Sequence, residues 1–429
     1  MTTKIVVVGA GYAGTLAAKK MADSFYGEKD VDISIIDRHH FQTMRNQLFE
    51  VVAGRVGEES VRINLNQVFK GTKVRLIKDE ITAVDFKEKT LTGGRGSYDY
   101  DILMLATGSR PTYFGIKGAE ENSQPLWSYE DAVALREHIK MQFCRAKLET
   151  DRKVREGLLT FFVVGAGFTG VETAGELAEW MPSLCSAYSI PQEDVRLIEC
   201  DMMDRPVMDF PRRLSKKIGD RLESMGFELM MKTGVTAVEP DSITVKTDGR
   251  ERTIPTATVI WAAGVEGSEL IKSCAESCEI EGRYRIKVNE NLQAEGLQDV
   301  YVGGDNSFIM LDDKPNPQVV ENAKQTAAVI AHNIGVDVHG GAYKSYEPSF
   351  HGFMVSLGGR YGVANVGFND TRFPLPPFMS QGAKHVSNLI YMTSVAGIFR
   401  SCEYIEDEFL EVPDRRSFLS LRFAQPWKR

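Results

Sequence analysis

Two stretches of the chain read Gly9-Ala10-Gly11-Tyr12-Ala13-Gly14 and Gly165-Ala166-Gly167-Phe168-Thr169-Gly170. Each has the spacing G-x-G-x-x-G, follows a run of apolar residues typical of a buried strand (4–8 and 159–164), and precedes a helix-forming segment. In this motif the first glycine permits a tight turn, the second lets a pyrophosphate approach the backbone, and the third lets helix and strand pack closely. The free N–H groups of the helix then bind the phosphates. The sequence therefore predicts two dinucleotide sites.

Each glycine turn is followed by a helix and a second strand that ends in an acidic residue. The strand at 31–36 closes on Asp37, and the strand at 195–198 closes on Glu199. An acid at this place accepts hydrogen bonds from an adenosine ribose, and it repels the 2′-phosphate of NADPH. We therefore expect Glu199 to select NADH.

A third set of strand ends indicates which turn binds which dinucleotide. The strand at 100–105 ends in Ala106-Thr107-Gly108, its counterpart at 257–261 ends in Ala262-Ala263-Gly264, and a late strand at 299–302 ends in Gly303-Gly304-Asp305. An Asp in that late position can bind the ribitol or pyrophosphate of an extended FAD. The late strand belongs with the first unit, so we expect FAD in the first unit and NADH in a second unit inserted within it.

The expected fold class is α/β, with two Rossmann-like dinucleotide-binding domains and a C-terminal domain. The predicted boundaries are 1–116 and 285–340 for the two parts of the FAD domain, 117–284 for the NADH domain, and 341–429 for a membrane-association or dimerisation domain. A length of 429 residues suits two or three domains. The net charge of −8 argues against a nucleic-acid partner, because binding to phosphates needs a basic surface.

The C-terminal region combines apolar and basic residues. Val386, Leu389, Ile390 and Thr393 fall on one helical face, flanked by Lys384, His385 and Arg400, and the tail at 415–429 is basic and rich in aromatic residues. This mixture suits an interfacial membrane anchor, and the most apolar stretch is too short to span a bilayer. A dimer interface or a packed terminal helix would have the same amphipathic pattern.

Taken in order, these motifs resemble those of the two-dinucleotide-binding-domain flavoproteins over nearly the whole chain. Within that superfamily the sequence is most similar to type II NADH dehydrogenases, the single-subunit NADH:quinone oxidoreductases. The resemblance implies FAD-dependent oxidation of NADH and two-electron reduction of a membrane quinone, by a ping-pong route and without proton pumping. It also implies a homodimer and a peripheral, monotopic position on the cytoplasmic face of the cell membrane.

The resemblance assigns the catalytic roles to Glu172, Glu321 and Gln325. Glu172 lies in the first turn of the second motif's helix, near the nicotinamide and the flavin in the family, although an acid there also suits the helix dipole. The family usually has Ala-Gln and, a turn later, Gln-Gln beside the quinone, where this chain has Val320-Glu321 and Gln325-Thr326. Glu321 can therefore supply protons, mark a different acceptor, or be an ordinary exposed helix residue.

The remaining expected contacts are with the two cofactors, and no metal is expected. Those assigned to FAD are Gly9, Gly11, Tyr12, Ala13, Gly14, Asp37, Arg38, Ala106, Thr107, Gly108, Gly304, Asp305, Asn322 and Ala323. Those assigned to NADH are Gly165, Gly167, Phe168, Thr169, Gly170, Glu172, Glu199, Ala263 and Gly264.

The six cysteines help to exclude other flavoproteins. None forms a C-x-x-C pair, and residues 38–54, where related disulfide reductases have a redox cysteine, contain none. The electrons are therefore expected to leave the flavin for an external acceptor. Two further functions stay open: a reductase that feeds a soluble electron-carrier protein, since an acidic surface can dock a basic carrier, and a flavoprotein that senses NADH.

Overall fold

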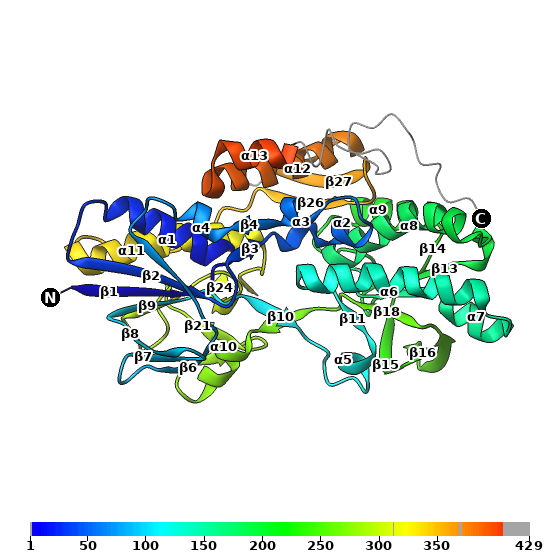
Figure 1. The fold of residues 1–429 in the computed structure, drawn as a ribbon, viewed down its shortest axis with the longest axis horizontal. Helices are drawn as coiled ribbons and strands as arrows, with labels where there is room; N and C mark the ends of the chain where they lie inside the picture. The colour runs from blue at the N-terminus through cyan, green and yellow to red at the C-terminus, as the bar shows by residue number, and fades with distance from the viewer. Residues whose placement is uncertain (1, 312, 369–370, 406–429) are drawn as a thin grey trace.

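The computed structural model describes residues 2–311, 313–368 and 371–405. Its framework is a pair of five-stranded parallel sheets that lie in the left and right halves of the molecule (Figure 1). The first sheet has the order β22-β9-β1-β2-β5, formed by Val300–Val302, Ile102–Leu105, Thr3–Val8, Val31–Asp37 and Val74–Lys78. The second has the order β11-β18-β12-β13-β14, formed by Gln124–Pro125, Thr258–Trp261, Thr160–Val164, Arg196–Cys200 and Phe227–Met230.

The second sheet is inserted within the first, as the sequence predicts. Strand β22 pairs in parallel with β9, although the whole second sheet lies between them in the chain. Two short antiparallel strands, β10 (Ser109–Pro111) and β19 (Val265–Gly267), connect the halves on the way out and back (Figure 1). Below, the half with the first sheet is called the FAD half and the half with the second sheet the NADH half.

The boundary expected at residue 284 differs from the packing. Helix α10 (Glu269–Ser273) follows β19 directly, and its Leu270 and Ile271 belong to the hydrophobic core of the FAD half. The chain therefore returns to the first core soon after β19, about fifteen residues before the expected boundary. The apolar spacing of this segment did not reveal which of the two cores it joins.

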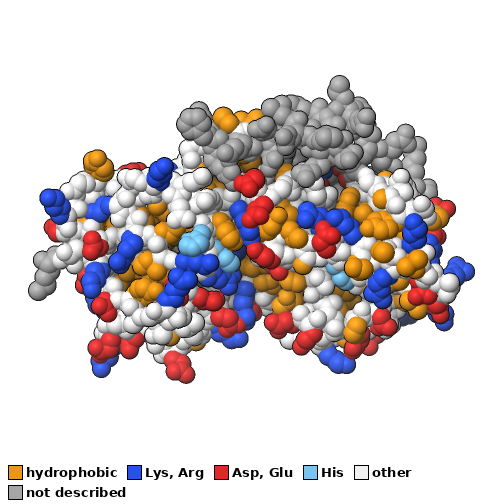
Figure 2. Space-filling model, in the orientation of Figure 1, with side chains coloured by type: hydrophobic (Ala, Val, Ile, Leu, Met, Phe, Trp, Pro, Cys, Tyr) orange, Lys and Arg blue, Asp and Glu red, His pale blue; other side chains and the backbone are white. Residues whose placement is uncertain are grey.

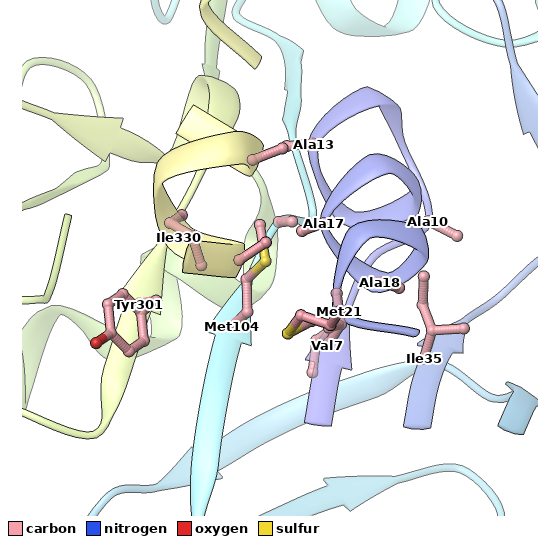
Figure 3. Packing of buried hydrophobic residues seen from close by; sticks show 14 of the residues in the cluster. Val7, Ala10, Ala13, Ala17, Ala18, Met21, Ile35, Met104, Tyr301 and Ile330 are labelled. Carbon is pink, nitrogen blue, oxygen red and sulfur yellow. The ribbon is translucent and has the colours of Figure 1, made fainter. Parts of the chain in front are cut away.

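Two helices cover the first sheet. Helix α1 (Tyr12–Ser24) lies beside α11 (Val320–His339), and Ala13, Ala17 and Ala18 let α1 approach closely, as Figure 3 shows. Gly14 is needed where α1 packs on the glycine turn, because an added Cβ would lie 1.9 Å from the Gly9 carbonyl oxygen. Smaller elements complete this half: β3 (Phe41–Thr43), β4 (Arg62–Asn64), α4 (Leu65–Val68), β6 (Ile81–Asp85), β7 (Thr90–Gly93) and β8 (Gly96–Asp99). Two short helices of the same part of the chain, α2 (Leu48–Val52) and α3 (Glu58–Val61), pack instead in the core of the NADH half.

The NADH half is covered by longer helices. Helix α6 (Tyr129–Leu148) follows its N-cap Ser128, whose side chain forms a capping box with Asp131. The second motif's helix, α8, runs from Phe168 to Tyr188 and continues through Pro182. The other elements are α5 (Ala119–Asn122), α7 (Arg152–Leu158), α9 (Arg212–Ser224) and the antiparallel strands β15 (Thr233–Glu239), β16 (Ser242–Thr247) and β17 (Arg250–Pro255).

The C-terminal region forms a layer above both halves (Figure 1). Strands β26 (Gly352–Ser356), β27 (Gly362–Phe368) and β28 (Thr371–Pro374) make an antiparallel sheet, and Gly358 and Gly359 lie in the turn between β26 and β27. Helices α12 (Pro377–Ala396) and α13 (Ile398–Ile405) follow. Within the described ranges, no helix combines the length and apolar character needed to cross a bilayer. The predicted basic tail at 415–429 lies outside the described residues.

Candidate active site

The first glycine turn leaves an open helix N-terminus. Gly9 has a φ of +100°, and a Cβ added there would lie 2.4 Å from the Ala106 carbonyl oxygen. At Gly11 an added Cβ would meet nothing within 4 Å, and no side chain caps the start of α1. The first amides of α1 thus face open space, which is the arrangement that binds a pyrophosphate.

The second glycine turn repeats this geometry at α8. Gly165 has a φ of +102°, and its added Cβ would lie 2.4 Å from the Ala262 carbonyl oxygen. A Cβ added at Gly170 would lie 1.7 Å from the Gly165 carbonyl oxygen. Gly167 faces open space, and no side chain caps the start of α8. The residues of both turns therefore fit a dinucleotide pyrophosphate.

An aspartate stands beside each turn in the same way. Asp37 accepts hydrogen bonds from the backbone N–H groups of Ala10 and His39, both at 2.7 Å. Asp201 accepts hydrogen bonds from Ala166 at 2.7 Å and Met203 at 2.8 Å. The equivalent of Asp37 in the NADH half is therefore Asp201.

The prediction that Glu199 binds the ribose is wrong in this structure. Its side chain is fully buried, because it lies two positions earlier in β13 and points beneath α8, where an added Cβ on Gly170 would lie 3.1 Å from Oε1. Neither carboxyl oxygen has a hydrogen-bond partner within the described part of the chain, and burial raises the pKa of Glu199. The signal was available in the spacing, since Val31 to Asp37 and Val195 to Asp201 have equal lengths.

The other predicted FAD residues converge at the carboxyl ends of β9 and β22. Asp305 accepts a hydrogen bond from the Ser109 hydroxyl at 2.5 Å. The Asn306 side chain accepts from the Gly108 N–H at 2.8 Å and donates to the Gly108 carbonyl at 2.6 Å. This amide joins the predicted Ala106-Thr107-Gly108 and Gly304-Asp305 segments. Ser109 and Asn306 had no sequence signal of their own.

Helix α11 begins against the same place. The Thr326 hydroxyl accepts a hydrogen bond from the Gly304 N–H at 3.0 Å, and no side chain caps the first turn. Asn322 is buried and its amide donates to the Gly304 carbonyl at 3.4 Å, with Ala323 adjacent. The structure thus brings Asn322 and Ala323 to the predicted FAD turn.

Two further FAD candidates differ in their surroundings. The Tyr12 hydroxyl donates to the Asn46 side chain at 2.6 Å, and its ring centroid lies 4.7 Å from that of Tyr391 on α12. Arg38 is exposed and lies 3.6 Å from the Glu80 carboxylate. Arg38 therefore borders the first site on its solvent side.

Glu172 is buried at the contact between α8 and the C-terminal layer. Its carboxylate pairs with the Lys384 ammonium of α12 and accepts a hydrogen bond from the Ser356 N–H at 3.0 Å. Burial raises the pKa of Glu172, although Lys384 opposes the shift. The expectation that Lys384 and His385 flank an outward face of the helix is wrong, because both side chains are buried.

Known proteins identify this arrangement. Residues 3–327 match the family model described as pyridine nucleotide-disulphide oxidoreductase. A type II NADH:quinone oxidoreductase from Staphylococcus haemolyticus is 32% identical over 380 residues, which cover 88% of this chain and 93% of the relative. The chain belongs to the type II NADH:quinone oxidoreductases.

Other relatives agree with this assignment. The type II enzyme from Staphylococcus aureus is 31% identical over 365 residues, covering 85% of this chain and 89% of the relative. The solved structure of NDH2 from Plasmodium falciparum in complex with NADH has a TM-score of 0.85 at 16% identity, covering 98% of this chain and all of the other. A sulfide:quinone oxidoreductase from Aquifex aeolicus has a TM-score of 0.76 at 15% identity, covering 96% of each chain. These two structures share the fold.

At position 321 this type II enzyme has Glu where the family usually has Gln, and the Glu321 side chain is paired with a residue of the C-terminal segment. The Glu321 carboxylate pairs with the His351 ring and also accepts from the His351 N–H at 3.2 Å. One turn later, the Gln325 side chain donates to the Ser349 carbonyl at 2.7 Å and accepts from its N–H at 2.9 Å. Both side chains thus hold the segment that leads into β26.

Proposed function

We propose that this chain oxidises NADH through FAD and reduces a membrane quinone with two electrons, by a ping-pong route and without proton pumping. The observation that carries the proposal is the repeated turn, in which Asp37 and Asp201 bond the amides of Ala10 and Ala166 beside uncapped helices. FAD, when bound, supplies the centre that takes a hydride from NADH and releases two electrons. The protein has to bind and align, because hydride transfer depends on position.

The binding roles follow from the geometry. The amides at Gly11 and Gly167 would hold the two pyrophosphates, and Asp37 would accept the FAD adenosine ribose. Asp201 takes the place proposed earlier for Glu199 and would accept the NADH ribose. Asp305, held by Ser109, would bind the ribitol or pyrophosphate of FAD.

Glu172 is proposed as the catalytic carboxyl on the NADH side. Glu172 lies three residues after Thr169 on α8 and is therefore close to the predicted NADH turn. The Lys384 ammonium compensates its charge in a buried site, and burial raises the pKa of the carboxyl. Glu172 can therefore exchange a proton in a place from which bulk water is excluded.

Glu321 and Gln325 are proposed to line the acceptor side. Glu321 has a titratable partner in His351, so the pair can pass a proton between carboxylate and imidazole. Gln325 would contribute by holding the segment at Ser349 in place.

The membrane contact is proposed for the outer face of the C-terminal layer. Six large apolar side chains are more than half exposed there, on β27, β28 and α12: Phe368, Phe373, Phe378, Met379, Val386 and Ile390. Hydrophobic side chains are visible at this upper edge in Figure 2, whereas charges of both signs are interspersed over the rest of the visible face. A cluster of this kind favours a peripheral position on a bilayer, here proposed at its cytoplasmic face.

A panel of acceptors tests the proposal. The FAD-loaded protein would be mixed with NADH and, in turn, a short-chain quinone, ferricyanide and a soluble one-electron carrier protein. We expect rapid turnover with the quinone and slow turnover with the carrier. Faster turnover with the carrier, or binding of NADH without turnover, would replace the proposal by one of the two alternatives. Sedimentation in detergent tests the expected homodimer separately.

A further inference from the structure

One face of α8 carries three buried or half-buried acids and a glycine at helical spacing. These residues, Glu172, Gly175, Glu176 and Glu179, are here called the α8 stripe, and spacings of three and four place them on one side of the helix. The stripe faces the turn between β26 and β27. A Cβ added at Gly175 would lie 2.7 Å from the Gly358 N and 2.8 Å from Leu357, so the turn's backbone lies directly on the helix.

Helix α2 packs its apolar residues in the same core as α6 and α8, and Asn46 just before it accepts a hydrogen bond from the predicted FAD residue Tyr12 at 2.6 Å. From the end of this segment, Arg55 approaches the stripe. It follows α2, where its backbone N–H bonds the Glu50 carbonyl at 2.9 Å. Its guanidinium donates through Nε to Glu176 Oε2 at 2.9 Å and through Nη2 to Glu176 Oε1 at 2.9 Å. The same Nη2 lies 3.0 Å from Glu179 Oε2. A fork of this kind fixes both the distance and the angle between its partners.

The C-terminal turn closes the same cluster. The Gly359 N–H donates to Glu179 Oε2 at 3.0 Å, and a Cβ added at Gly359 would lie 2.4 Å from Arg55 Nη1. One guanidinium therefore lies where the α2 segment, helix α8 and the C-terminal turn meet. Only 8% of its side chain is exposed.

The energetics of the cluster favour a role in geometry. Burying an ion pair costs desolvation energy that its attraction often only balances, so an apolar contact of the same volume would stabilise the fold equally well. The neighbouring carboxylates raise the pKa of Arg55 and keep it charged, whereas burial raises the pKa of Glu176. What an apolar contact lacks is a fixed orientation. The helix oriented by Arg55 is also the one whose N-terminus forms the predicted NADH turn and whose first turn holds Glu172.

We propose that Arg55 is a positioning residue: its guanidinium fastens α8 to the α2 segment, which contacts the predicted FAD residue Tyr12 through Asn46, and to the C-terminal turn, and so sets the distance over which NADH delivers its hydride to FAD. The Arg55 contacts described above are with Glu176, Glu179 and the C-terminal turn, and not with either predicted cofactor turn. Its effect is therefore expected on the rate of flavin reduction at saturating NADH, with little effect on the binding of either dinucleotide.

The main test compares Arg55→Lys with Arg196→Lys. Arg196 makes a forked ion pair with Glu228 at 3.2 and 2.5 Å, but both residues lie in the second sheet, so this pair holds neither the α2 segment nor the C-terminal turn. The limiting rate of flavin bleaching by NADH would be measured by stopped flow, beside FAD content and the dissociation constant of NADH. We expect Arg55→Lys to slow bleaching about 10- to 100-fold, as a misplacement of about 1 Å does, with NADH affinity changed less than about threefold. Arg196→Lys should leave the rate within about twofold.

Hydrogen–deuterium exchange separates positioning from local support. If Arg55 fastens α8, amide exchange should rise together in 48–55, in 168–179 and in the turn at 357–361 of Arg55→Lys. A rise confined to 48–55 with a normal bleaching rate would overturn the proposal, as would an equal loss of rate in Arg196→Lys. If Arg55→Lys loses FAD, the milder substitution Glu179→Gln provides the test. We expect flavin bleaching by NADH to be about two- to fivefold slower, on the order of one weakened hydrogen bond. An unchanged bleaching rate would refute the positioning role of Arg55.

Discussion

The assignment of Asp201 gives a prediction with a built-in control two residues away. Asp201→Asn removes a negative charge beside the Ala166 amide but keeps one acceptor oxygen for that N–H. Glu199→Gln removes the same charge type from a fully buried side chain. The two substitutions are chemically alike, so a difference between them reports only on position.

The expected magnitude follows from the hydrogen bonds that would be lost. A hydrogen bond to a charged group contributes about 1.5–3 kcal/mol, and each 1.4 kcal/mol is about tenfold in a dissociation constant. Asp201→Asn should therefore weaken NADH binding roughly 10- to 100-fold. Because Asp201 stands at the adenosine end of the proposed site, kcat should change less than about twofold. Glu199→Gln should do little, because its side chain is fully buried beneath α8 and neither carboxyl oxygen has a hydrogen-bond partner among the described residues.

The assay is steady-state turnover with NADH and NADPH at saturating quinone, together with the dissociation constant of NADH. Wild-type protein should prefer NADH, and Asp201→Asn should narrow that preference because the 2′-phosphate is no longer repelled. If Glu199→Gln instead raised the KM for NADH while Asp201→Asn left it unchanged, the assignment of the ribose contact to Asp201 would be refuted. A loss of FAD from Asp201→Asn would also contradict it, since the residue lies in the other half.

Three further outcomes are expected. Lys384→Met should cost about 3–5 kcal/mol of stability by leaving Glu172 buried without a counter-ion, and adding Glu172→Gln should restore most of the unfolding temperature but not the activity. Burial lowers the pKa of His385 from 6.5 to about 4, so the unfolded chain binds this proton more tightly than the folded chain does. Stability should therefore fall by up to about 3 kcal/mol as the pH drops through this range. Thermal unfolding of His385→Gln should show a flatter pH dependence than that of the wild-type protein, and an identical slope would contradict the burial argument. Glu321→Gln should leave flavin bleaching by NADH unchanged and slow reoxidation by quinone, and the opposite pattern in stopped flow would place Glu321 on the NADH side.

The fold could be predicted because its signals are local and repeated. A glycine turn constrains the strand before it and the helix after it, so two turns located both parallel sheets, and the late Gly303-Gly304-Asp305 showed that one is inserted in the other. The capping box at Ser128 was equally local. The end of α8 is not set by a local signal. The helix continues through Pro182 and buries Leu184 and Cys185, and that packing outweighs the tendency of proline to end a helix.

Register in a buried strand was harder to predict than the strand itself. An acid at the end of an apolar run suggested Glu199, yet the chain has two acids there, separated by Cys200. Only one of them can bond the amide after the first glycine of the turn, and the Gly165 N–H bonds the Cys200 carbonyl as the Gly9 N–H bonds that of Ile36. Alignment of the two repeats from their first residues, rather than from the first acid, gives the correct register.

The surroundings of the charged residues on α12 were not predictable for a different reason. Lys384 and His385 next to an apolar stripe suggested the polar rim of a membrane anchor, because helical periodicity reports which residues share a face and not what covers that face. In the fold, α12 lies between the FAD half and the β26–β27 sheet, so the face with Lys384 is interior. The residue that makes burial tolerable is Glu172, 212 positions earlier in the chain. Because a buried cation needs a partner, an unexpectedly interior lysine indicates an acid on another element, and here that acid is the one the motif had already singled out.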